Sequence, residues 1–365
     1  MDPKLANIII VNYNGESDLR TCLSSMLLQT YDKFDITVVD SGSSDMSAEI
    51  IEREFPQVRL IKENNIGYGM GNNRGIEATN GEYVIISNMD VEVDPNWLMR
   101  MIECCNHSDK IGIVTPKILL YEEREKINTC GNTLQFMGFG TCRGRGEPKA
   151  SYNSAEEILC PSGASFLIKR QVLKHIGFFD TSIQDATTPR RTTQDYYQEA
   201  DVAWRAWVTG YHVMFEPRAL VYHKYVVKPL NHIRFMDLEI NRLSFILSTY
   251  SFSTLVVLFP FLLFAEIVAF GFALTKGFSF VLAKFRAYGW MIKNSNVVKK
   301  KRIARQRLRQ LNDDRIFGMY GYQIEFTHQT NKNFFMAKVE NGLNFIFKMM
   351  YKTVKTLWCM RLNKQ

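Results

Sequence analysis

Residues 83–95 read Tyr-Val-Ile-Ile-Ser-Asn-Met-Asp-Val-Glu-Val-Asp-Pro. The stretch opens with apolar side chains and then changes abruptly to polar and acidic ones, which predicts a buried parallel strand at 83–86 that emerges at 87–90. Open α/β sheets bind ligands beyond the carboxyl ends of their strands, so Asn88, Asp90 and Glu92 are candidates to face a ligand. The alternative is a solvated turn before a helix that starts near Pro95, with Asp94 as its N-cap.

Asp90 is the candidate metal ligand of this stretch. Carboxylates suit Mg²⁺ or Mn²⁺ that carries substrate phosphates, because these ions keep several waters and need only one or two protein carboxylates. His223 ends a later apolar run that begins at Ala219. A single histidine is usually structural, and His223 gains weight only as a partner of Asp90 on a metal.

The composition limits the class of protein. A chain of 365 residues with 46% apolar side chains is long enough for two or three domains with a substantial core. Its seven cysteines show no paired spacing, which argues against a zinc ribbon or a disulfide framework and favours a reducing compartment. Strand-like residues follow the first residue almost at once, so we expect no secretory leader.

The charge is distributed unevenly. Residues 276–365 contain 19 Lys and Arg against 4 Asp and Glu, whereas residues 1–275 contain 26 against 33. A basic segment of this kind favours either nucleic acid or an anionic membrane surface. No recognisable nucleic-acid-reading module accompanies it, so we expect no nucleic-acid partner.

Strand and helix patterns alternate over the first ninety residues. Strands are predicted at 6–11, 36–39, 58–61 and 83–86, with helices at 16–29, 46–55 and 72–79 between them. This alternation predicts an α/β fold with a mostly parallel, doubly wound sheet. Polar residues follow each strand and should meet at one edge of the sheet. They include Asn12, Asn14, Asp40, the segment 64–67 and Asn88.

Residues 67–75, Gly-Tyr-Gly-Met-Gly-Asn-Asn-Arg-Gly, are rich in glycine. We expect a loop that lets the backbone approach a ligand and that opens a helix whose N-terminus favours anions. A dinucleotide-binding fingerprint needs G-x-G-x-x-G after the first strand, and here the third glycine comes one residue early in a loop after the third strand. The pattern therefore argues against an oxidoreductase. Arg143 and Arg145, in a predicted loop, are candidates to close on a diphosphate, with solvated loop arginines as the commoner outcome.

Glu199 and Asp201 precede a predicted helix that Gly210 ends. Residues two positions apart on a helix differ in direction by roughly 200°, so the two carboxylates cannot both face one substrate. One is a candidate general base for an attacking hydroxyl, and the other caps the helix or pairs with Arg205. The sequence leaves the choice between them open.

Several of these motifs together resemble glycosyltransferase family 2, the inverting nucleotide-sugar enzymes of GT-A fold, and within it the rhamnosyltransferase-like branch. The resemblance covers about residues 5–225. Its motifs are Val11-Asn12-Tyr13-Asn14, Val38-Val39-Asp40-Ser41-Gly42-Ser43-Ser44-Asp45, Asn65-x-Gly67-Tyr68 through Asn73-x-Gly75, Asn88-Met89-Asp90, Gly177-Phe178-Phe179-Asp180, and Glu199 to Arg205 followed by Gly210-Tyr211.

The resemblance implies a role for each matching residue. Asp40 would hold the base or ribose, Asp90 would coordinate Mg²⁺ or Mn²⁺ on the diphosphate with His223 as a further ligand, and Glu199 would be the base. Further nucleotide-sugar contacts would come from Asn12, Asn14, Gly67, Asn73, Arg74 and Asn88.

The chain departs from the family pattern in three ways. Asn88 stands first in the usual Asp-x-Asp, and Glu199 stands where the family's base is normally aspartate. Between Asp180 and Tyr196 the chain is about ten residues longer than the family pattern and carries Arg190 and Arg191. This insertion borders the expected acceptor side.

Residues 254–275 form an apolar run long enough to span a bilayer, interrupted by Pro260 and Glu266. A carboxylate near the middle is unfavourable in lipid unless it faces protein or water. Nucleotide sugars are cytosolic, so the catalytic part should be cytoplasmic, and the basic segment after the apolar run also prefers that side. Because both ends of the apolar run are then on one side, a single crossing is not expected. We expect a kinked hairpin or a monotopic insertion, broken near 260–266 or 276–277, with a buried soluble helical domain as the alternative.

We therefore expect a GT-A catalytic domain at 1–235, a helical membrane-associated segment at 236–310, with membrane contact through 252–310, and an amphipathic tail at 311–365. The predicted activity is inverting transfer of one sugar from a nucleotide-diphosphate sugar to a lipid-linked or cell-surface glycan acceptor, at the cytoplasmic face of the membrane. Single addition is expected because Gln306-x-x-Arg309 is followed by Gln310 and not by Trp. The alternatives are a catalytically degenerate binding protein of the same fold and a nucleotidyl transferase.

Overall fold

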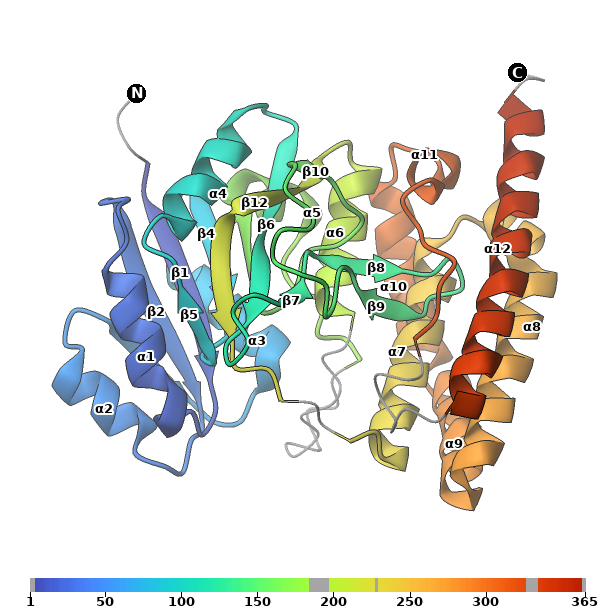
Figure 1. Cartoon of the computed structure of the whole chain (residues 1–365), viewed down its shortest axis with the longest axis horizontal. Coiled ribbons are helices and arrows are strands. Elements are labelled where there is room, and N and C mark those ends of the chain that lie inside the picture. Colours follow the sequence, from blue (N-terminus) through green and yellow to red (C-terminus); the bar gives the residue numbers. More distant parts are fainter. Residues whose placement is uncertain (1–3, 184–196, 227–228, 326–333, 363–365) are drawn as a thin grey trace. The chain divides into compact units, whose positions relative to one another are not determined.

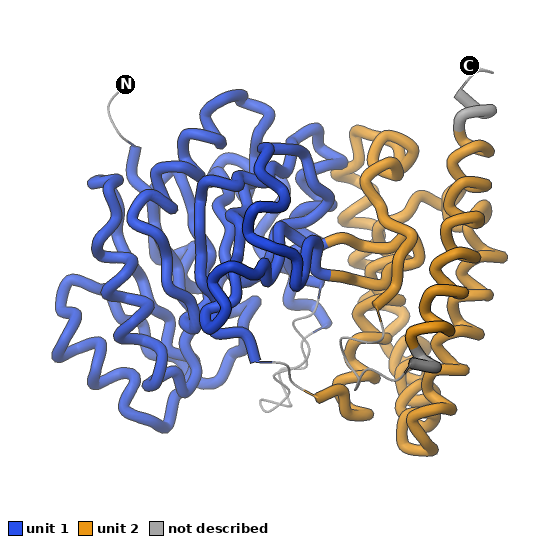
Figure 2. The backbone as a smooth tube through the Cα atoms, viewed as in Figure 1, with its two compact units in different colours: residues 1–132, 142–226 blue, residues 133–141, 227–365 orange. Residues whose placement is uncertain are grey.

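The computed structural model describes residues 4–183, 197–226, 229–325 and 334–362 (Figure 1). The chain forms two compact units (Figure 2). Unit 1 comprises residues 1–132 and 142–226, and unit 2 comprises residues 133–141 and 227–365.

The described elements of the first unit alternate between strands and helices for most of its length. They are β1 (Ala6–Asn12), α1 (Glu16–Leu27), β2 (Phe34–Ser41), α2 (Ser47–Glu54), β3 (Arg59–Glu63), α3 (Gly67–Glu77), β4 (Tyr83–Ser87), β5 (Val91–Val93), α4 (Trp97–Asn106), β6 (Ile111–Leu120), β7 (Ile127–Thr129), β10 (Glu156–Glu157), β11 (Ser165–Lys169), α5 (Arg170–Ile176), α6 (Gln198–Val208) and β12 (His212–His223). The short strands β8 (Asn132–Leu134) and β9 (Gly140–Cys142) pair with each other where the chain passes between the units.

One mixed, mostly parallel sheet forms the centre of unit 1. Its strand order is β10-β12-β6-β11-β4-β1-β2-β3, with β5 paired to β12 and β7 paired to β6. Strands β3, β2, β1 and β4 run parallel, while β11 runs antiparallel to both β4 and β6. The predicted α/β class with a mostly parallel sheet is confirmed.

Both faces of this sheet are covered by helices. Ile8 and Ile10 of β1 belong to an apolar core cluster that also contains side chains of α1, α2 and α4. Ile9 points to the other face, because successive side chains of a strand alternate, and there it meets α3. Since both faces are buried, β1 and β4 are apolar along their whole length, which is why they could be located from sequence.

The glycine-rich stretch at 67–75 is a helix and not the predicted loop. Helix α3 begins at Gly67, five residues before the predicted start. A Cβ atom at Gly71 would lie 2.8 Å from Val11, and one at Gly75 would lie 2.4 Å from Ile9. The two glycines therefore allow α3 to pack directly on β1, and this close helix–strand packing explains much of the glycine content.

The start of helix α4 also differs from the prediction. Asn96, and not Asp94, is the N-cap residue. Asp94 lies in the turn before it, where its Oδ1 accepts a hydrogen bond from the Asn96 N–H at 2.9 Å. An aspartate can accept a backbone hydrogen bond either in an Asx-turn or as a helix N-cap, and the sequence alone does not distinguish the two roles.

The second unit is helical. It contains α7 (His232–Thr249), α8 (Phe252–Lys276), α9 (Phe278–Lys293), α10 (Ser295–Leu308), α11 (Asp313–Phe317) and α12 (Phe334–Leu362). Helix α8 runs without interruption through Pro260 and Glu266, so the break predicted there is wrong. The other predicted break is confirmed, because Gly277 separates α8 from α9 with a φ of +104°.

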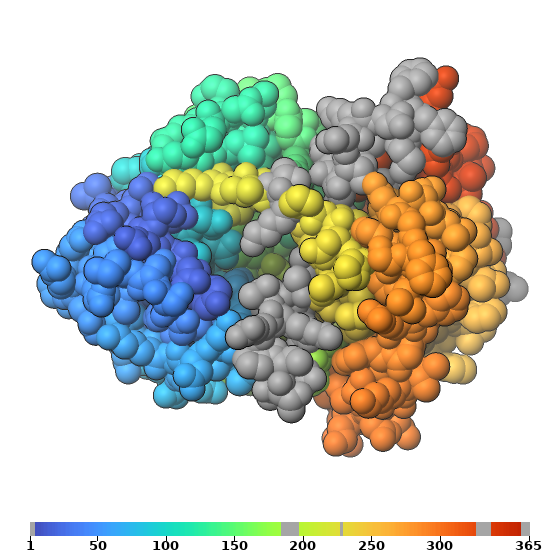
Figure 3. Space-filling view, turned by 90° about the horizontal axis from the view of Figure 1, so that it is seen from below, coloured from blue at the N-terminus to red at the C-terminus, as the bar shows by residue number. Residues whose placement is uncertain are grey.

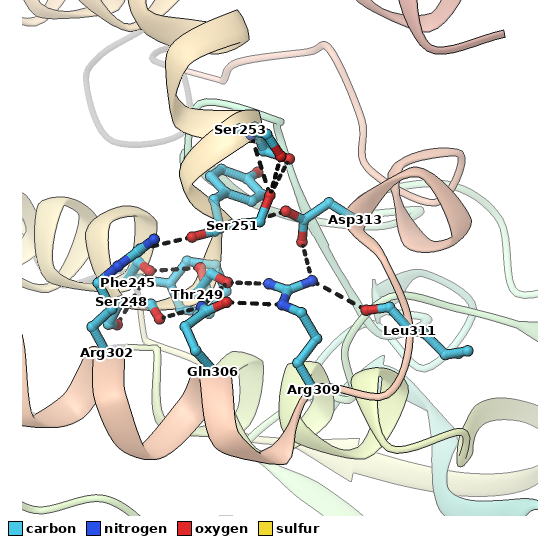
Figure 4. Close-up of polar contacts among 12 residues, drawn as sticks. Phe245, Ser248, Thr249, Ser251, Ser253, Arg302, Gln306, Arg309, Leu311 and Asp313 are labelled. Carbon is cyan, nitrogen blue, oxygen red and sulfur yellow. Dashed lines mark hydrogen bonds and ion pairs between the residues drawn. The ribbon is translucent and has the colours of Figure 1, made fainter. Parts of the chain in front are cut away.

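The end of α7 is capped by side chains of α10 (Figure 4). Gln306 Nε2 donates to the carbonyls of Ser248 and Thr249 at 3.1 and 2.8 Å, and Arg309 donates to Thr249 O at 2.5 Å. These carbonyls have no partner within their own helix, and cations near a helix C-terminus are stabilising. Gln306 and Arg309 thus have a structural role in unit 2, while Ser251 begins α8 by accepting from the Thr254 N–H at 3.2 Å.

A buried group of charges joins three helices of unit 2. Arg242 of α7 pairs with Glu239 at 2.8 Å and with Glu266 of α8, and Lys284 of α9 pairs with Glu239 and with Glu266, the latter at 2.7 Å. Burial alone would raise the pKa of Glu239, but Arg242 and Lys284 hold it below the usual range. Glu266, the carboxylate of the apolar helix α8, is therefore paired with buried cations of the same unit.

Replacing Arg242 by methionine should destabilise the protein strongly. The change leaves Glu239 and Glu266 with only Lys284 as a neutralising cation, and breaking a buried ion pair from one side typically lowers the free energy of unfolding by about 3–5 kcal/mol. Denaturant unfolding followed by circular dichroism measures this. Arg286→Met, at an exposed position of α9, is the control and should change stability little. Equal stability of both variants would contradict a structural role for the buried network.

Candidate active site

The carboxyl ends of β1 and β2 lie side by side, since Asn12 and Asp40 are paired in the parallel register. Asn12 Nδ2 donates to Asp40 Oδ1 at 2.7 Å, and Ser43 donates to the same carboxylate from Oγ at 2.5 Å and from its N–H at 3.2 Å. Both Asn12 and Asp40 are buried. Asn12 Oδ1 is a buried oxygen that accepts no hydrogen bond from the described residues. Asp40 is thus oriented from the protein side at the edge where a ligand is expected.

Three of the other residues predicted to contact the nucleotide sugar, Asn14, Asn73 and Arg74, mainly hold neighbouring segments of the chain. Asn14 adopts a left-handed conformation with φ of +53°, and its Oδ1 accepts from the Ser44 N–H at 2.8 Å. The Asn73 amide makes two 2.9 Å hydrogen bonds with the backbone of Phe179. Arg74 is half exposed and pairs with Glu63 at 2.7 Å. Gly67, with φ of +75°, begins α3.

Asp90 and His223 meet beyond β4. The His223 Nε2 atom lies 3.3 Å from Asp90 Oδ1. That oxygen is buried and accepts no hydrogen bond of ordinary geometry from the described residues. Burial by itself would raise the pKa of Asp90, but His223, a backbone N–H and the Asn88 amide hold it below the usual aspartate range. The residue pair that was predicted from positions 133 apart in sequence is therefore brought together.

Asn128 is a site residue that the sequence analysis missed. Its Oδ1 lies 3.1 Å from His223 Nδ1, and the residue is buried at the edge strand β7. Because an amide oxygen only accepts, His223 Nδ1 is the donor in this hydrogen bond, and the ring is held with Nε2 toward Asp90. No sequence signal marked Asn128, which is an ordinary polar residue in a short strand.

The Asp90–His223 pair fits a divalent cation. Two lone-pair donors 3.3 Å apart repel each other unless a proton or a cation lies with them, and adjacent ligands of an octahedral ion are separated by roughly 3 Å. Within the part of the chain that the structure describes, no group of three or more His, Cys, Asp or Glu side chains could hold a metal ion. Two protein ligands are nevertheless sufficient for an ion that also binds substrate phosphates.

Glu199 lies in the first turn of α6, against Gly163, two residues before β11 begins. A Cβ atom at Gly163 would come within 1.9 Å of Glu199 Oε1, so the carboxylate occupies the space that a larger residue would fill. The Tyr68 hydroxyl donates to Gly163 O at 3.0 Å, and the Asn88 N–H donates to Ala164 O at 3.0 Å. Glu199 therefore sits one strand away from the Asn88–Asp90 segment.

Gly163→Ala tests this placement. The added methyl group must displace the Glu199 carboxylate, so we expect turnover to fall by about tenfold or more while donor affinity is retained, because misplacing a catalytic group by an ångström is enough for such a loss. Steady-state kinetics and donor binding by calorimetry measure the two quantities. Gly140→Ala is the matched control, since a Cβ there meets nothing closer than 3.6 Å. Unchanged turnover in Gly163→Ala would argue against a role for Glu199.

Asp201 has a different environment from Glu199. It is buried and accepts from Arg205 Nε and Nη2 at 3.0 and 2.9 Å, which confirms the predicted pairing between the two residues. Arg205 also donates to the carbonyls of Ile176, Gly177 and Phe178. Asp201 is thereby committed to holding the segment 176–178, and of the two candidate bases it is Glu199 that lies beside Gly163.

Other charged candidates are neutralised locally. Glu92 receives two hydrogen bonds from Arg124, at 2.9 and 2.8 Å, so it does not face a ligand as predicted. Arg143 pairs with Glu156 and donates to Cys130 O at 3.1 Å, so it is a structural residue and not a free diphosphate clamp. Arg145 stacks over Tyr225 at 4.6 Å. Arg190 and Arg191 lie outside the described residues.

The strand order is that of a GT-A fold. Two solved structures of TarS from S. aureus, in complex with UDP-GlcNAc and with UDP, align with 98% of this chain at TM-scores of 0.54 and 0.52. They cover 92% and 91% of the TarS chains, at 14% and 15% identity. GalNAc-T7 with UDP, GalNAc and Mn²⁺ aligns with 68% of this chain and 50% of its own, with a TM-score of 0.51 and 16% identity.

Residues 7–177 match the model of glycosyl transferase family 2. A poly-beta-1,6-N-acetyl-D-glucosamine synthase of Staphylococcus epidermidis is 30% identical over 223 residues, which is 59% of this chain and 48% of that protein. An uncharacterized glycosyltransferase of Escherichia coli, YibD, is 39% identical over 106 residues, 28% of this chain and 31% of its own. The matched part of the chain thus corresponds to about half the length of the synthase and to about a third of the length of YibD.

Proposed function

We propose that the protein transfers a single sugar, with inversion, from a nucleotide-diphosphate sugar to a hydroxyl group of a lipid-linked or cell-surface glycan acceptor. The observation that carries the proposal is the position of Glu199 against Gly163, together with the meeting of Asp90, after β4, and His223, at the end of β12. A proton acceptor and a pair of cation ligands at one sheet edge are what such a displacement needs. The rhamnosyltransferase-like branch remains a proposal from sequence.

Each side chain would have one task. Asp40, oriented by Asn12 and Ser43, accepts hydrogen bonds from the base or ribose of the donor. Asp90 and His223 would hold Mg²⁺ or Mn²⁺, whose charge offsets that of the departing diphosphate. Asn128 keeps the His223 Nε2 lone pair directed toward Asp90. Glu199 orients the acceptor hydroxyl and takes its proton.

The bonds change in one displacement. The acceptor oxygen forms a bond to the anomeric carbon as the bond from that carbon to the diphosphate oxygen breaks. The proton moves to Glu199, and the nucleoside diphosphate leaves with the electron pair of the broken bond. Attack opposite to the leaving group inverts the anomeric centre, and positioning supplies much of the acceleration.

The experiment measures nucleoside diphosphate release from UDP-, GDP- and dTDP-sugars, with Mg²⁺ or Mn²⁺ and with a chelator. UDP-GlcNAc is the first donor to test, because the TarS complex contains it and the synthase relative is named for an N-acetylglucosamine polymer. Release from one donor that the chelator abolishes supports the proposal. Release of pyrophosphate would identify a nucleotidyl transferase. Donor binding with no release, even with a polyprenyl-phosphate acceptor present, would contradict the proposal.

The second candidate is a binding protein that keeps the fold but has lost catalysis. It is favoured by Asn88, which replaces the first carboxylate of the family's Asp-x-Asp, and by the change from aspartate to Glu199. Such a protein would bind the donor with no turnover. The same donor panel therefore distinguishes the two candidates.

We also place the protein at the cytoplasmic face of the cell membrane, attached through residues 252–310. Helix α8 is long and apolar enough to cross a membrane, and it is the one helix of this kind among the described residues. Nucleotide sugars are cytosolic, and the basic residues after α8 prefer the cytoplasmic side. Fractionation of expressing cells tests this placement, since the chain should sediment with membranes.

A further inference from the structure

Helix α8 exposes one apolar face along its whole length. Only 22% of its most apolar stretch is buried, although the helix belongs to a packed unit. The exposed side chains recur every three, four or seven residues, which places them on one side of the helix over about 33 Å. They are Phe252, Val256, Phe259, Leu263, Ile267 and Leu274.

Helix α9 adds to this surface. Phe278, Leu282, Phe285 and Ile292 are exposed at the same spacing, and Phe285 contacts Phe270 of α8 with ring centroids 5.9 Å apart. Together the exposed side chains of α8 and α9 form what we call the apolar face. Soluble monomers rarely expose apolar surface that is continuous over two helices, so a second surface is expected to cover it.

One acidic side chain, Glu266, borders the apolar face, since it lies seven residues after Phe259 and one before Ile267. Glu266 of α8 is paired with Arg242 of α7 and with Lys284 of α9, both fully buried in unit 2. If α8 crossed a bilayer, these charges and Arg286 of α9 would be drawn into the hydrocarbon, which is strongly unfavourable. The ion pairs therefore favour a helix that contacts lipid from one side and protein from the other.

Exposed basic side chains are frequent in α9 and in the helices that follow it in unit 2. Helix α12 contacts α8 through Phe347 and Phe264, whose ring centroids are 5.8 Å apart. Part of the surface of α8, α9 and α10, in shades of orange, can be followed in Figure 3. The exposed basic residues are Arg286 and Lys293 of α9, Lys299 and Lys300 of α10, and Lys348, Lys352 and Lys355 of α12. Lysines beside an apolar surface are typical of helices that bind anionic lipid.

We propose that the apolar face of α8 and α9 lies in one leaflet of an anionic membrane, parallel to its plane, and that α8 does not cross the bilayer. This inference specifies the membrane placement proposed above, and it does not depend on catalysis. It commits to lipid, and not to a second copy of the chain, because Arg286 and Lys293, each directly after an exposed apolar residue of α9, would repel their counterparts across a symmetric interface but attract anionic headgroups.

The first test is flotation of the full chain with phosphatidylcholine vesicles that contain or lack phosphatidylglycerol. We expect the protein to float with the anionic vesicles, and the double variant Phe259→Glu/Ile267→Glu to bind at least about tenfold more weakly, because two apolar side chains no longer leave water. Leu28→Glu is the matched control, since Leu28 is a 70% exposed leucine of unit 1. Equal flotation of the double variant and Leu28→Glu would overturn the proposal. A stable dimer in light scattering, lost in the double variant and without vesicle binding, would also overturn it.

The second test determines whether α8 crosses. Ser253→Cys and Thr275→Cys place thiols near the two ends of α8 at exposed positions. In spheroplasts of the expression host, an impermeant thiol reagent should label neither variant above the background of the native cysteines, and both should react after lysis. Labelling of one of them in intact spheroplasts would show a crossing. Nucleoside diphosphate release from a soluble donor should be unchanged in the Phe259→Glu/Ile267→Glu variant, which separates attachment from catalysis.

Discussion

Asp90→Asn is expected to lower metal-dependent nucleoside diphosphate release by about 10²–10³-fold, since one charge-stabilising group of an active site typically contributes this much. The substitution keeps the size of the side chain but removes the charge of the oxygen that lies 3.3 Å from His223 Nε2. Mn²⁺ affinity, measured by electron paramagnetic resonance of the free ion, should fall as well. This second measurement reports on the site even if no donor has been found.

The matched control for Asp90→Asn is Glu92→Gln. Glu92 lies two residues away, but its carboxylate is taken up by Arg124, so activity and Mn²⁺ affinity should stay within a few-fold of the parent protein. Asn128→Leu should weaken Mn²⁺ binding by about 10–100-fold, as is usual when the partner that orients a ligating histidine is removed. Full Mn²⁺ affinity in Asp90→Asn would exclude this carboxylate as a ligand.

Glu199→Gln should abolish most of the sugar transfer, by about 10²–10⁴-fold, because a glutamine cannot accept the proton of the attacking hydroxyl. Donor affinity should be retained, since the carboxylate acts on the acceptor and not on the nucleotide. Transfer to acceptor, measured by product formation at saturating donor, and donor binding by calorimetry separate the two effects. A loss of donor affinity with normal maximal turnover would place Glu199 in the donor site and remove it as the base.

Asp201→Asn distinguishes the two carboxylates of α6. It leaves the buried Arg205 without its ion pair, so the free energy of unfolding should fall by about 3 kcal/mol. At a temperature where the variant is folded, its transfer rate should be much closer to that of the parent than the rate of Glu199→Gln. The reverse order of the two rates would make Asp201 the base.

Most of the fold could be predicted from local patterns. The strands β1, β4 and β11 are short apolar runs bounded by polar residues, and burial on both faces of a sheet produces that pattern directly. The error at α3 has a physical cause as well. Glycine is the usual residue of loops, and only its contacts with Val11 and Ile9 show that it serves helix packing here.

The residue types of the site could be predicted, but their tasks could not. Sequence presented Glu199 and Asp201 as equal candidates, since both are carboxylates in one helical turn. The structure separates them, because Asp201 is paired with Arg205 of the same helix whereas Glu199 lies against Gly163 of another segment. Asn128 could not be found, because only the pairing of strand ends brings a common asparagine to the ring of His223.

The sequence by itself determined the strand and helix order, the sheet edge where polar residues gather, and the presence of an apolar helix followed by a basic segment. These properties depend on the spacing of apolar and charged residues, which is a local property of the chain. Tertiary structure alone decided that Gly163 lies beside Glu199, that Asn128 contacts His223, and how Glu266 is accommodated. Each of these depends on contacts between residues far apart in the chain, such as that of Glu266 with Arg242 and Lys284, and no local pattern encodes them.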